Sequence, residues 1–123
     1  MAFNEETLDR IRKMLFSKEI DFSEKKMFMG VCIMVDDKMC CGTHISKSTN
    51  EDLLFCRISD EDYREVAGRD DVLPMKMGER VMKNYIYVLE HGFQNEKDLE
   101  YWLQLCLNYN PTAKSSKKKS KKN

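Results

Sequence analysis

A block of nineteen residues, 24–42, constrains the fold of this chain more than any other segment. An apolar run at residues 27–35 is followed by the polar pair Asp36-Asp37, and a second strand-like run begins at Lys38. Two such runs joined by a two-residue polar turn predict a β-hairpin. The block holds four methionines and three cysteines but few residues of the types that catalyse reactions. It therefore predicts a packing or recognition module rather than an enzyme site.

The remaining sequence predicts helices and further strands around this hairpin. Asn4 is the expected N-cap of a first helix that ends near residue 17. Ser59 is the expected N-cap of a short helix that Gly68 ends, and Asn95 is the expected N-cap of a last helix that Pro111 ends. Strands are expected at about residues 23–28, 30–35, 38–45, 53–58 and 82–89, with an irregular segment at 69–78. The order α-β-β-β-β-α-β-α predicts an α+β fold of two layers, a mainly antiparallel sheet with helices on one face.

The charge distribution separates a folded domain from a tail. Residues 111–123 contain six lysines and no acid, whereas the whole chain has 21 basic and 21 acidic residues, so residues 1–110 carry an excess of six acids. We therefore expect one domain at 1–110 and a disordered lysine-rich tail at 111–123. This tail could contact nucleic-acid phosphates nonspecifically, could equally fold back on the acidic domain, or could serve only solubility. Its lysines are Lys114, Lys117, Lys118, Lys119, Lys121 and Lys122.

Cysteine usage and hydropathy favour a cytoplasmic protein. The five cysteines are odd in number, and the acidic N-terminal residues do not form a secretory signal. Reduced thiols are the simplest interpretation. The apolar runs fall well short of the roughly 20 residues that span a bilayer, so no membrane partner is expected.

Catalytic and metal-binding patterns are not found in the sequence. It has two histidines and lacks the glycine-rich phosphate-binding, nucleophile-elbow and zinc-protease motifs. Cys40, Cys41 and His44 are close in sequence, but neighbouring strand residues point to opposite faces, so a shared metal ion is not expected. We predict a protein that is not an enzyme and that uses no cofactor or metal.

Three features bear on redox chemistry and partners. If Asp36 and Asp37 form the loop, Cys32 is expected to face Cys41 across the hairpin, as a pair that oxidation could join. The methionines of the hairpin could fill the core or form an adaptable binding surface. The last helix is apolar over more than one stripe, which leaves a homodimer as one expectation.

Two segments resemble the N-terminal domain of the TfoX/Sxy family. The first has a K-K-M-F pattern, a glycine, and then a K-M pair before a second glycine; the second has a G-x-R-x-M-K pattern followed by a tyrosine. Asp36-Asp37 and Asn84 depart from the Asn-Gly pair and the glycine usual in the family. The residues that carry the resemblance are Lys25, Lys26, Met27, Phe28, Gly30, Lys38, Met39, Gly42, Gly78, Arg80, Met82, Lys83 and Tyr85.

The resemblance implies a bacterial protein whose fold is related to secretion chaperones. Larger members regulate natural competence, the uptake of DNA, together with the cyclic-AMP receptor protein at promoters, and they carry a second, helical domain where this chain has its tail. The expected function is thus a regulatory module that acts through protein contacts. The alternative is a small chaperone-like domain that binds peptides or proteins on a methionine-rich sheet face.

Overall fold

The computed structural model describes residues 3–27 and 30–113, apart from the side chains of Met27 and Met77. The predicted motif residue Phe28 and the six tail lysines therefore lie outside the described residues. The elements are α1 (Glu5–Ser17), β1 (Ser23–Met27), β2 (Gly30–Val35), β3 (Lys38–Ile45), β4 (Asp52–Arg57), α2 (Asp60–Val66), β5 (Val72–Met77), β6 (Arg80–Val88), η1 (Glu90–Gly92), α3 (Glu96–Tyr109) and η2 (Asn110–Thr112).

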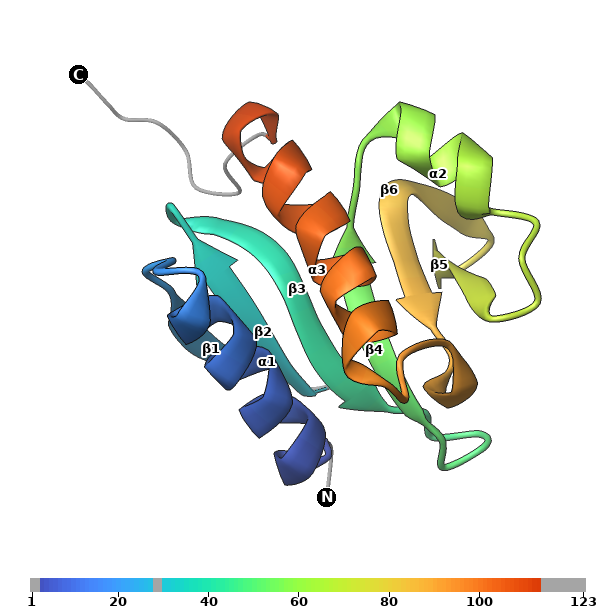
Figure 1. The fold of residues 1–123 in the computed structure, drawn as a ribbon. Helices are drawn as coiled ribbons and strands as arrows, with labels where there is room; N and C mark the ends of the chain where they lie inside the picture. The colour runs from blue at the N-terminus through green and yellow to red at the C-terminus, as the bar shows by residue number, and fades with distance from the viewer. Residues whose placement is uncertain (1–2, 28–29, 114–123) are drawn as a thin grey trace.

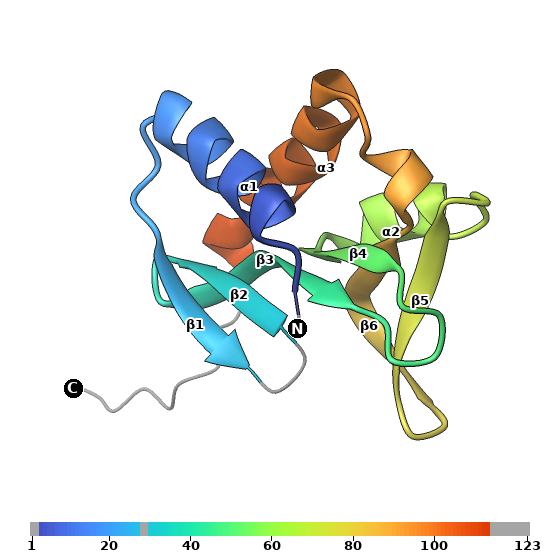
Figure 2. The same ribbon diagram turned by 90° about the horizontal axis from the view of Figure 1, so that it is seen from below.

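Over the described residues the strands form one antiparallel sheet in the order β1-β2-β3-β4-β6-β5 (Figure 1). The helices α1, α2 and α3 lie on one side of this sheet, and none of the helices among the described residues covers its other side (Figure 2). The sheet is strongly twisted, as expected from the right-handed twist of its strands. The predicted α+β class, with a mainly antiparallel sheet and helices on one face, is confirmed.

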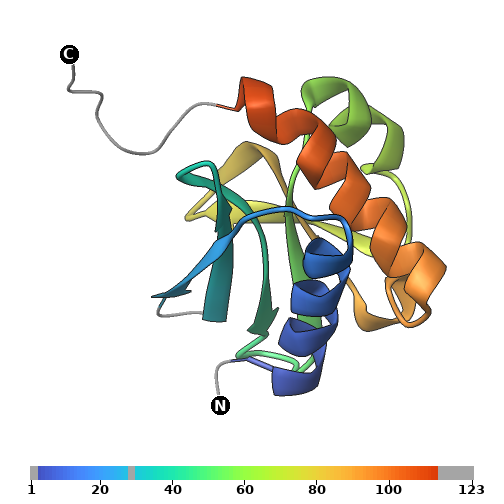
Figure 3. The same cartoon turned by 60° about the vertical axis from the view of Figure 1, so that its left-hand side comes forward.

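The helices begin where the sequence predicts them. The Asn4 side chain accepts hydrogen bonds from the amides of Glu6 and Thr7, Ser59 caps Asp62, and Asn95 caps Asp98. Each cap satisfies amide groups that a first helical turn leaves without a partner. The apolar stripes then face the sheet, so that α1 and α3 lie side by side over it (Figure 3). The buried stripes are Leu8, Ile11 and Leu15 on α1 and Leu99, Trp102, Leu103 and Cys106 on α3.

One strand is absent from the sequence prediction. Residues 69–78 were expected to be irregular because of Pro74, but β5 pairs with β6 and places Pro74 opposite Ile86. A proline cannot donate to a neighbouring strand, yet β5 is the outermost strand, with one side of its backbone unpaired. The expectation was wrong because proline excludes a central strand, not an edge strand.

The turn of the β2–β3 hairpin has the predicted two residues. Asp36 and Asp37 have φ angles of 56° and 64°, the left-handed values that a type I′ turn requires at both positions. Val35 pairs with Lys38 and Met34 with Met39, and the register then shifts so that Ile33 pairs with Cys41. The shift is a β-bulge with Cys40 as its extra residue.

The bulge corrects the predicted cysteine pair. Cys32 lies opposite Gly42 and not opposite Cys41, whose partner on β2 is Ile33. A one-residue shift reverses which face a side chain occupies, so the prediction that Cys32 and Cys41 face each other is wrong. The bulge also directs the adjacent Cys40 and Cys41 into the same helix-covered core. The expectation that they point to opposite faces is wrong for the same reason.

Two glycines let β2 and β3 approach closely. A Cβ atom on Gly42 would lie 2.4 Å from the carbonyl oxygen of Val31, and one on Gly30 would lie 2.1 Å from that of Thr43. Both distances are impossible for real carbon–oxygen contacts, because the obstacle is backbone that cannot rotate away. Only residues without a side chain fit this part of the hairpin.

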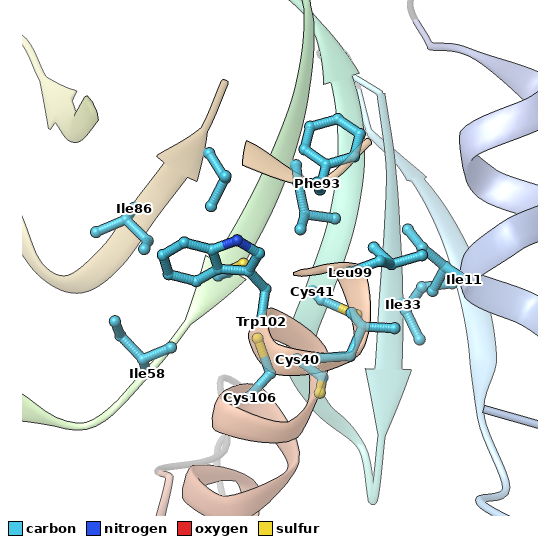
Figure 4. Packing of buried hydrophobic residues seen from close by; sticks show 14 of the residues in the cluster. Ile11, Ile33, Cys40, Cys41, Ile58, Ile86, Phe93, Leu99, Trp102 and Cys106 are labelled. Carbon is cyan, nitrogen blue, oxygen red and sulfur yellow. The ribbon is translucent and has the colours of Figure 1, made fainter. Parts of the chain in front are cut away.

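The core lies between the sheet and the two long helices (Figure 4). Trp102 is its largest fully buried side chain, and its indole nitrogen donates a hydrogen bond of 2.8 Å to the carbonyl of Gly92. A buried Trp needs such a partner for its N–H group. The bond also fixes the turn of η1 against α3, so that the chain enters the last helix in one orientation.

Candidate interaction surface

A continuous row of residues crosses the sheet on the side away from the helices. Its members are cross-strand neighbours in register: Lys25 on β1, Cys32 on β2, Gly42 on β3, Phe55 on β4, Tyr87 on β6 and Leu73 on β5. Residues opposite each other on adjacent strands point to the same face. We call these residues, with their neighbours His44, Leu53, Arg57 and Tyr85, the open face.

Aromatic rings fill the centre of the open face. The rings of His44 and Tyr87 stack with centroids 5.2 Å apart, and those of Phe55 and Tyr85 stack at 5.7 Å. The guanidinium of Arg57 lies 5.4 Å from the centroid of the Tyr85 ring. Stacked rings with a cation over one of them make a stiff surface, because each side chain is held by its neighbours.

The open face buries much of its own apolar area. Phe55 is only 7% exposed and Leu53 only 4%, although neither belongs to the core beneath the helices. Burial of the Tyr87 side chain likewise raises the pKa of its phenol. By contrast, Leu73 at the outer end of the row is 41% exposed. The exposed apolar part of the row is therefore at its β6–β5 end.

The two edges of the sheet are poor sites for adding a strand. β1 carries the exposed lysines Lys25 and Lys26, and β5 carries Pro74. Charged side chains and proline on an outer strand hinder pairing with another chain.

The basic motif residues do not gather into one patch. Lys25 and Lys26 are on β1 at one edge of the sheet, whereas Arg80 and Lys83 are on β6, next to the other edge. The Lys38 ammonium is bound to carbonyl groups at the end of α3. Among the described residues, the motif therefore supplies no compact basic surface for nucleic acid.

Lys38 instead holds the end of α3. Its ammonium donates hydrogen bonds to the carbonyls of Asn110 at 3.0 Å and Pro111 at 3.3 Å, and the Asn110 side chain donates to the carbonyl of Val35 at 3.1 Å. A cation suits the carbonyl-rich C-terminal end of a helix. The hairpin turn thus fixes the point where the tail begins.

The extra apolar residues of α3 are largely accommodated within the domain. Leu105 packs against the core, and Arg57 lies 6.0 Å from the centroid of the Tyr109 ring. Tyr101 remains 42% exposed, with Arg69 at 5.9 Å from its ring centroid. These contacts account for most of the width of the apolar surface, and the homodimer stays a prediction.

A buried carboxylate connects α1 to the sheet. Thr7 donates a hydrogen bond to Asp52 at 2.5 Å, and Thr43 donates another at 3.2 Å. Burial raises the pKa of Asp52, and the two hydroxyl donors oppose this rise. These two hydrogen bonds satisfy the buried carboxylate of Asp52, so the residue is a structural contact between the first turn of α1 and strands β3 and β4.

The described residues lack a cluster of metal-ligating side chains and a helix that could span a membrane. No three His, Cys, Asp or Glu side chains are placed to hold a metal ion among the residues that the structure describes. A surface depression of about 470 Å³ after α1 is lined by Phe16, Ser17, Glu19, Ile20 and Asp21. No helix within the described ranges is both long and apolar enough to cross a membrane.

Comparison with known families identifies the domain. The model of the TfoX N-terminal domain matches residues 15–109, which is most of the chain. The chain belongs to the TfoX N-terminal domain family. No curated protein and no solved structure matches it significantly.

In this TfoX domain, several motif residues have contacts or backbone conformations that hold the fold together. Gly30 and Gly42 permit the close approach of β2 and β3, Lys38 holds the end of α3, and Tyr85 stacks on Phe55. Gly78 has a φ of 66° in the β5–β6 turn. Asn84 replaces the family glycine at a φ of 73°, where its side chain donates to the carbonyl of Ile58 at 2.9 Å.

The apolar residues Leu53, Phe55 and Leu73 and the aromatic Tyr87 of the open face were not singled out from the sequence. The signal was present in residues 53–56, which are apolar without interruption and so predict a strand with apolar side chains on both faces. The register that places Phe55 beside Tyr87 and Leu73 is set by pairing between distant segments, and the sequence carries no local signal for it.

Proposed function

We propose that this TfoX domain is a regulatory interaction module that binds a protein partner through its open face. One observation carries the proposal: an apolar and aromatic row, Phe55, Tyr87 and Leu73, crosses strands β4, β6 and β5 on the side without helices and ends at the exposed Leu73. Exposed apolar residues beside stacked aromatic rings are typical of contact surfaces between proteins. Membership of the TfoX family supports a role in the control of competence.

The tail lysines add a second, nonspecific contact in this proposal. Six lysines could neutralise up to six phosphates, which corresponds to a log–log salt dependence of about −5 on duplex DNA. Lysine without interleaved aromatic residues reads no base sequence. The tail would thus raise the local concentration of the domain near DNA, while the open face selects the protein partner.

Site-specific photo-crosslinking in the native host tests the surface. A photoreactive phenylalanine is placed at Leu73 on the open face or, as the matched control, at Phe16, which is 82% exposed on the helix side. We expect a discrete adduct from position 73 and none from position 16. With the photoreactive residue placed instead at Tyr85 on the open face, Leu73→Asp should reduce the adduct by about tenfold, while Phe16→Asp leaves it unchanged. Adducts from position 16 alone, or from neither position, would contradict the proposal.

The same experiment examines the chaperone-like alternative. That alternative is favoured by Met34 and Met39, which pair across the hairpin and are half-buried. Flexible methionines suit many different bound sequences. A ladder of many adducts that grows after heat shock would favour a chaperone-like domain, whereas one or two adducts of constant size favour a regulatory module.

Tail deletion separates the two contacts. Removal of residues 114–123 should leave the adduct at position 73 intact but abolish binding to duplex DNA in fluorescence anisotropy. DNA binding that survives the deletion, or that is independent of salt, would contradict the role proposed for the tail.

A further inference from the structure

The two layers of this domain carry opposite net charge. The helices α1, α2 and α3 hold ten acidic and five basic residues, whereas the strands β1 to β6 hold two acidic and seven basic residues. All three helices lie on the same side of the sheet. A polyanion is therefore attracted to the sheet side of the domain and repelled from the helix side.

The β5–β6 hairpin projects from the sheet on the side away from the helices (Figure 2, Figure 3). Its bend follows from the strand pairing: between two ladder pairs β5 has one residue, Met75, where β6 has four, 82–85. Such a bulge bends the strand that carries the extra residues. Asn84 lies in the bulge, and its side chain donates hydrogen bonds to the carbonyl of Ile58 at 2.9 Å and to the carboxylate of Asp60 at 2.7 Å. We call residues 75–83 the arm.

The arm carries three exposed cations, Lys76, Arg80 and Lys83. No ion pair or hydrogen bond with the described residues engages these three side chains, whereas the guanidinium of Arg69 is held by a carboxylate at 2.8 Å. Lys76 pairs with Val81 and shares its face of the arm, so Arg80, the residue before Val81, lies on the other face. The arm is thus a narrow ribbon with positive charge on both faces.

We propose that the arm enters the major groove of duplex DNA and places Lys76, Arg80 and Lys83 against the phosphates. This groove is about 12 Å wide and admits a two-stranded β-ribbon. Because the arm has cations on both faces, it can meet the phosphate backbones on both sides of the groove. The inference rests on the proposed function in one respect, that the tail lysines hold the same duplex, and it leaves the open face to the protein partner.

The arm accounts for two motif residues that the fold leaves unexplained. Arg80 and Lys83 belong to the family motif, and with Lys76 they form a basic group that the motif residues alone do not provide. Contacts to phosphates fix the position and orientation of a protein on DNA but read no base sequence. Three charges alone bind DNA weakly, so the arm adds to the tail and does not replace it.

The test measures how salt weakens binding of the full-length chain to a labelled mixed-sequence DNA duplex, by fluorescence anisotropy. Nine cationic contacts, six from the tail and three from the arm, give a log–log salt slope of about −8. The arm variant replaces its three cations by alanine: Lys76→Ala, Arg80→Ala and Lys83→Ala. Its slope should fall to about −5, and its affinity at about 100 mM salt should fall at least tenfold.

The matched control removes three exposed cations from the helices. It combines Lys13→Ala, Arg64→Ala and Lys97→Ala. This variant loses the same net charge, but its slope should stay at about −8, because the helix side does not face the DNA. Circular dichroism and thermal melting confirm that both variants are folded. An arm variant with the wild-type slope, or equal losses in both variants, would overturn the proposal.

Photo-crosslinking to the same duplex gives an independent readout. A photoreactive phenylalanine at Val81, which is 46% exposed on the arm, should attach to DNA, whereas one at Phe16, 82% exposed on the helix side, should not. Duplex RNA should bind the arm variant and the wild type alike, since its major groove is too narrow for the arm. DNA attached at Phe16 alone counts against the arm. So does an arm variant that loses binding to anionic phospholipid vesicles but keeps the wild-type slope on DNA.

Failure of the arm and failure of the tail give different results. If the tail has no role, deletion of residues 114–123 leaves DNA binding unchanged, and the arm variant alone removes it. If the arm has no role, the arm variant binds DNA with the slope of the wild type. The adduct with a protein partner from position 73 is independent of both outcomes.

Discussion

The ammonium of Lys38 lies 3.0 Å from the carbonyl oxygen of Asn110, which joins the hairpin turn to the end of the last helix. Lys38 belongs to the family motif, and its side chain is only 14% exposed although it ends in an ammonium group. The second bond to Pro111 and the bond from Asn110 back to Val35 complete the contact. Charge alone would assign Lys38 to nucleic-acid binding, but its contacts make it a structural residue.

Removing this ammonium should weaken the domain. Lys38→Met keeps the length of the side chain but leaves the carbonyls of Asn110 and Pro111 without their donor. We expect a loss of about 1–2 kcal/mol in the free energy of unfolding, measured by urea denaturation. Lys26→Met, on the exposed edge strand β1, is the control and should change stability by less than about 0.5 kcal/mol. Equal effects from both variants would show that the contact is unimportant.

Adding one methyl group at Gly42 should be severely destabilising. In Gly42→Ala the new Cβ would lie 2.4 Å from the carbonyl oxygen of Val31, and the two strands would have to move apart. We expect a loss of at least about 3 kcal/mol or failure to fold, seen by circular dichroism and thermal melting. Gly68→Ala meets no atom within 4 Å and is the matched control, with an expected change near zero. A stable Gly42→Ala protein would mean that the hairpin is less tightly coiled than described.

The hairpin turn can be improved by restoring the residues usual in the family. Asp36 and Asp37 both have a left-handed backbone conformation, which is unfavourable for most residues other than glycine. An Asn-Gly pair suits a turn of this type best. The double variant Asp36→Asn, Asp37→Gly should raise the free energy of unfolding by about 0.5–1 kcal/mol. Alanine at both positions should lower it, since alanine gains nothing in that conformation. Thermal melting of the three proteins side by side gives the order.

The pH dependence of stability should reveal the buried Asp52. Its pKa is raised in the folded state, so the folded protein binds a proton more tightly than the unfolded chain does. The stability that Asp52 contributes is therefore greatest below pH 3.8, the pKa of this carboxyl in the unfolded chain, and it falls as pH rises from 3.8 through the folded pKa. In Asp52→Asn this fall should disappear, so the variant gains relative to wild type as pH rises from 3 to 7 in urea denaturation.

Asp71 provides a control of opposite sign. Its hydrogen bonds with Arg69, at 2.9 and 2.8 Å, lower the pKa of Asp71 in the folded state. The stability that it contributes is present above pH 3.8 and is lost as pH falls through the folded pKa. Asp71→Asn should therefore lose stability relative to wild type as pH rises, and the same slope in both variants would contradict the two assignments.

The sequence alone determined the parts of this domain that depend on neighbouring residues. Asn4, Ser59 and Asn95 cap helices, and Asp36-Asp37 turns the hairpin, because each of these signals acts within a few residues of the chain. The motif around Gly30 and Gly42 identified the family, and the alternation of segments gave the α+β class.

Tertiary structure decided what depends on pairing between distant segments. The bulge at Cys40 shifted the hairpin by one residue, which placed Gly42 rather than Cys41 opposite Cys32. Strand register brought Phe55, Tyr87 and Leu73 into one row, and edge position allowed Pro74 in a strand. Side chains change faces when register shifts by a single residue, and no local pattern encodes such a shift. The family of the domain can therefore be recognised from its short motifs, whereas the open face exists only after the sheet has formed.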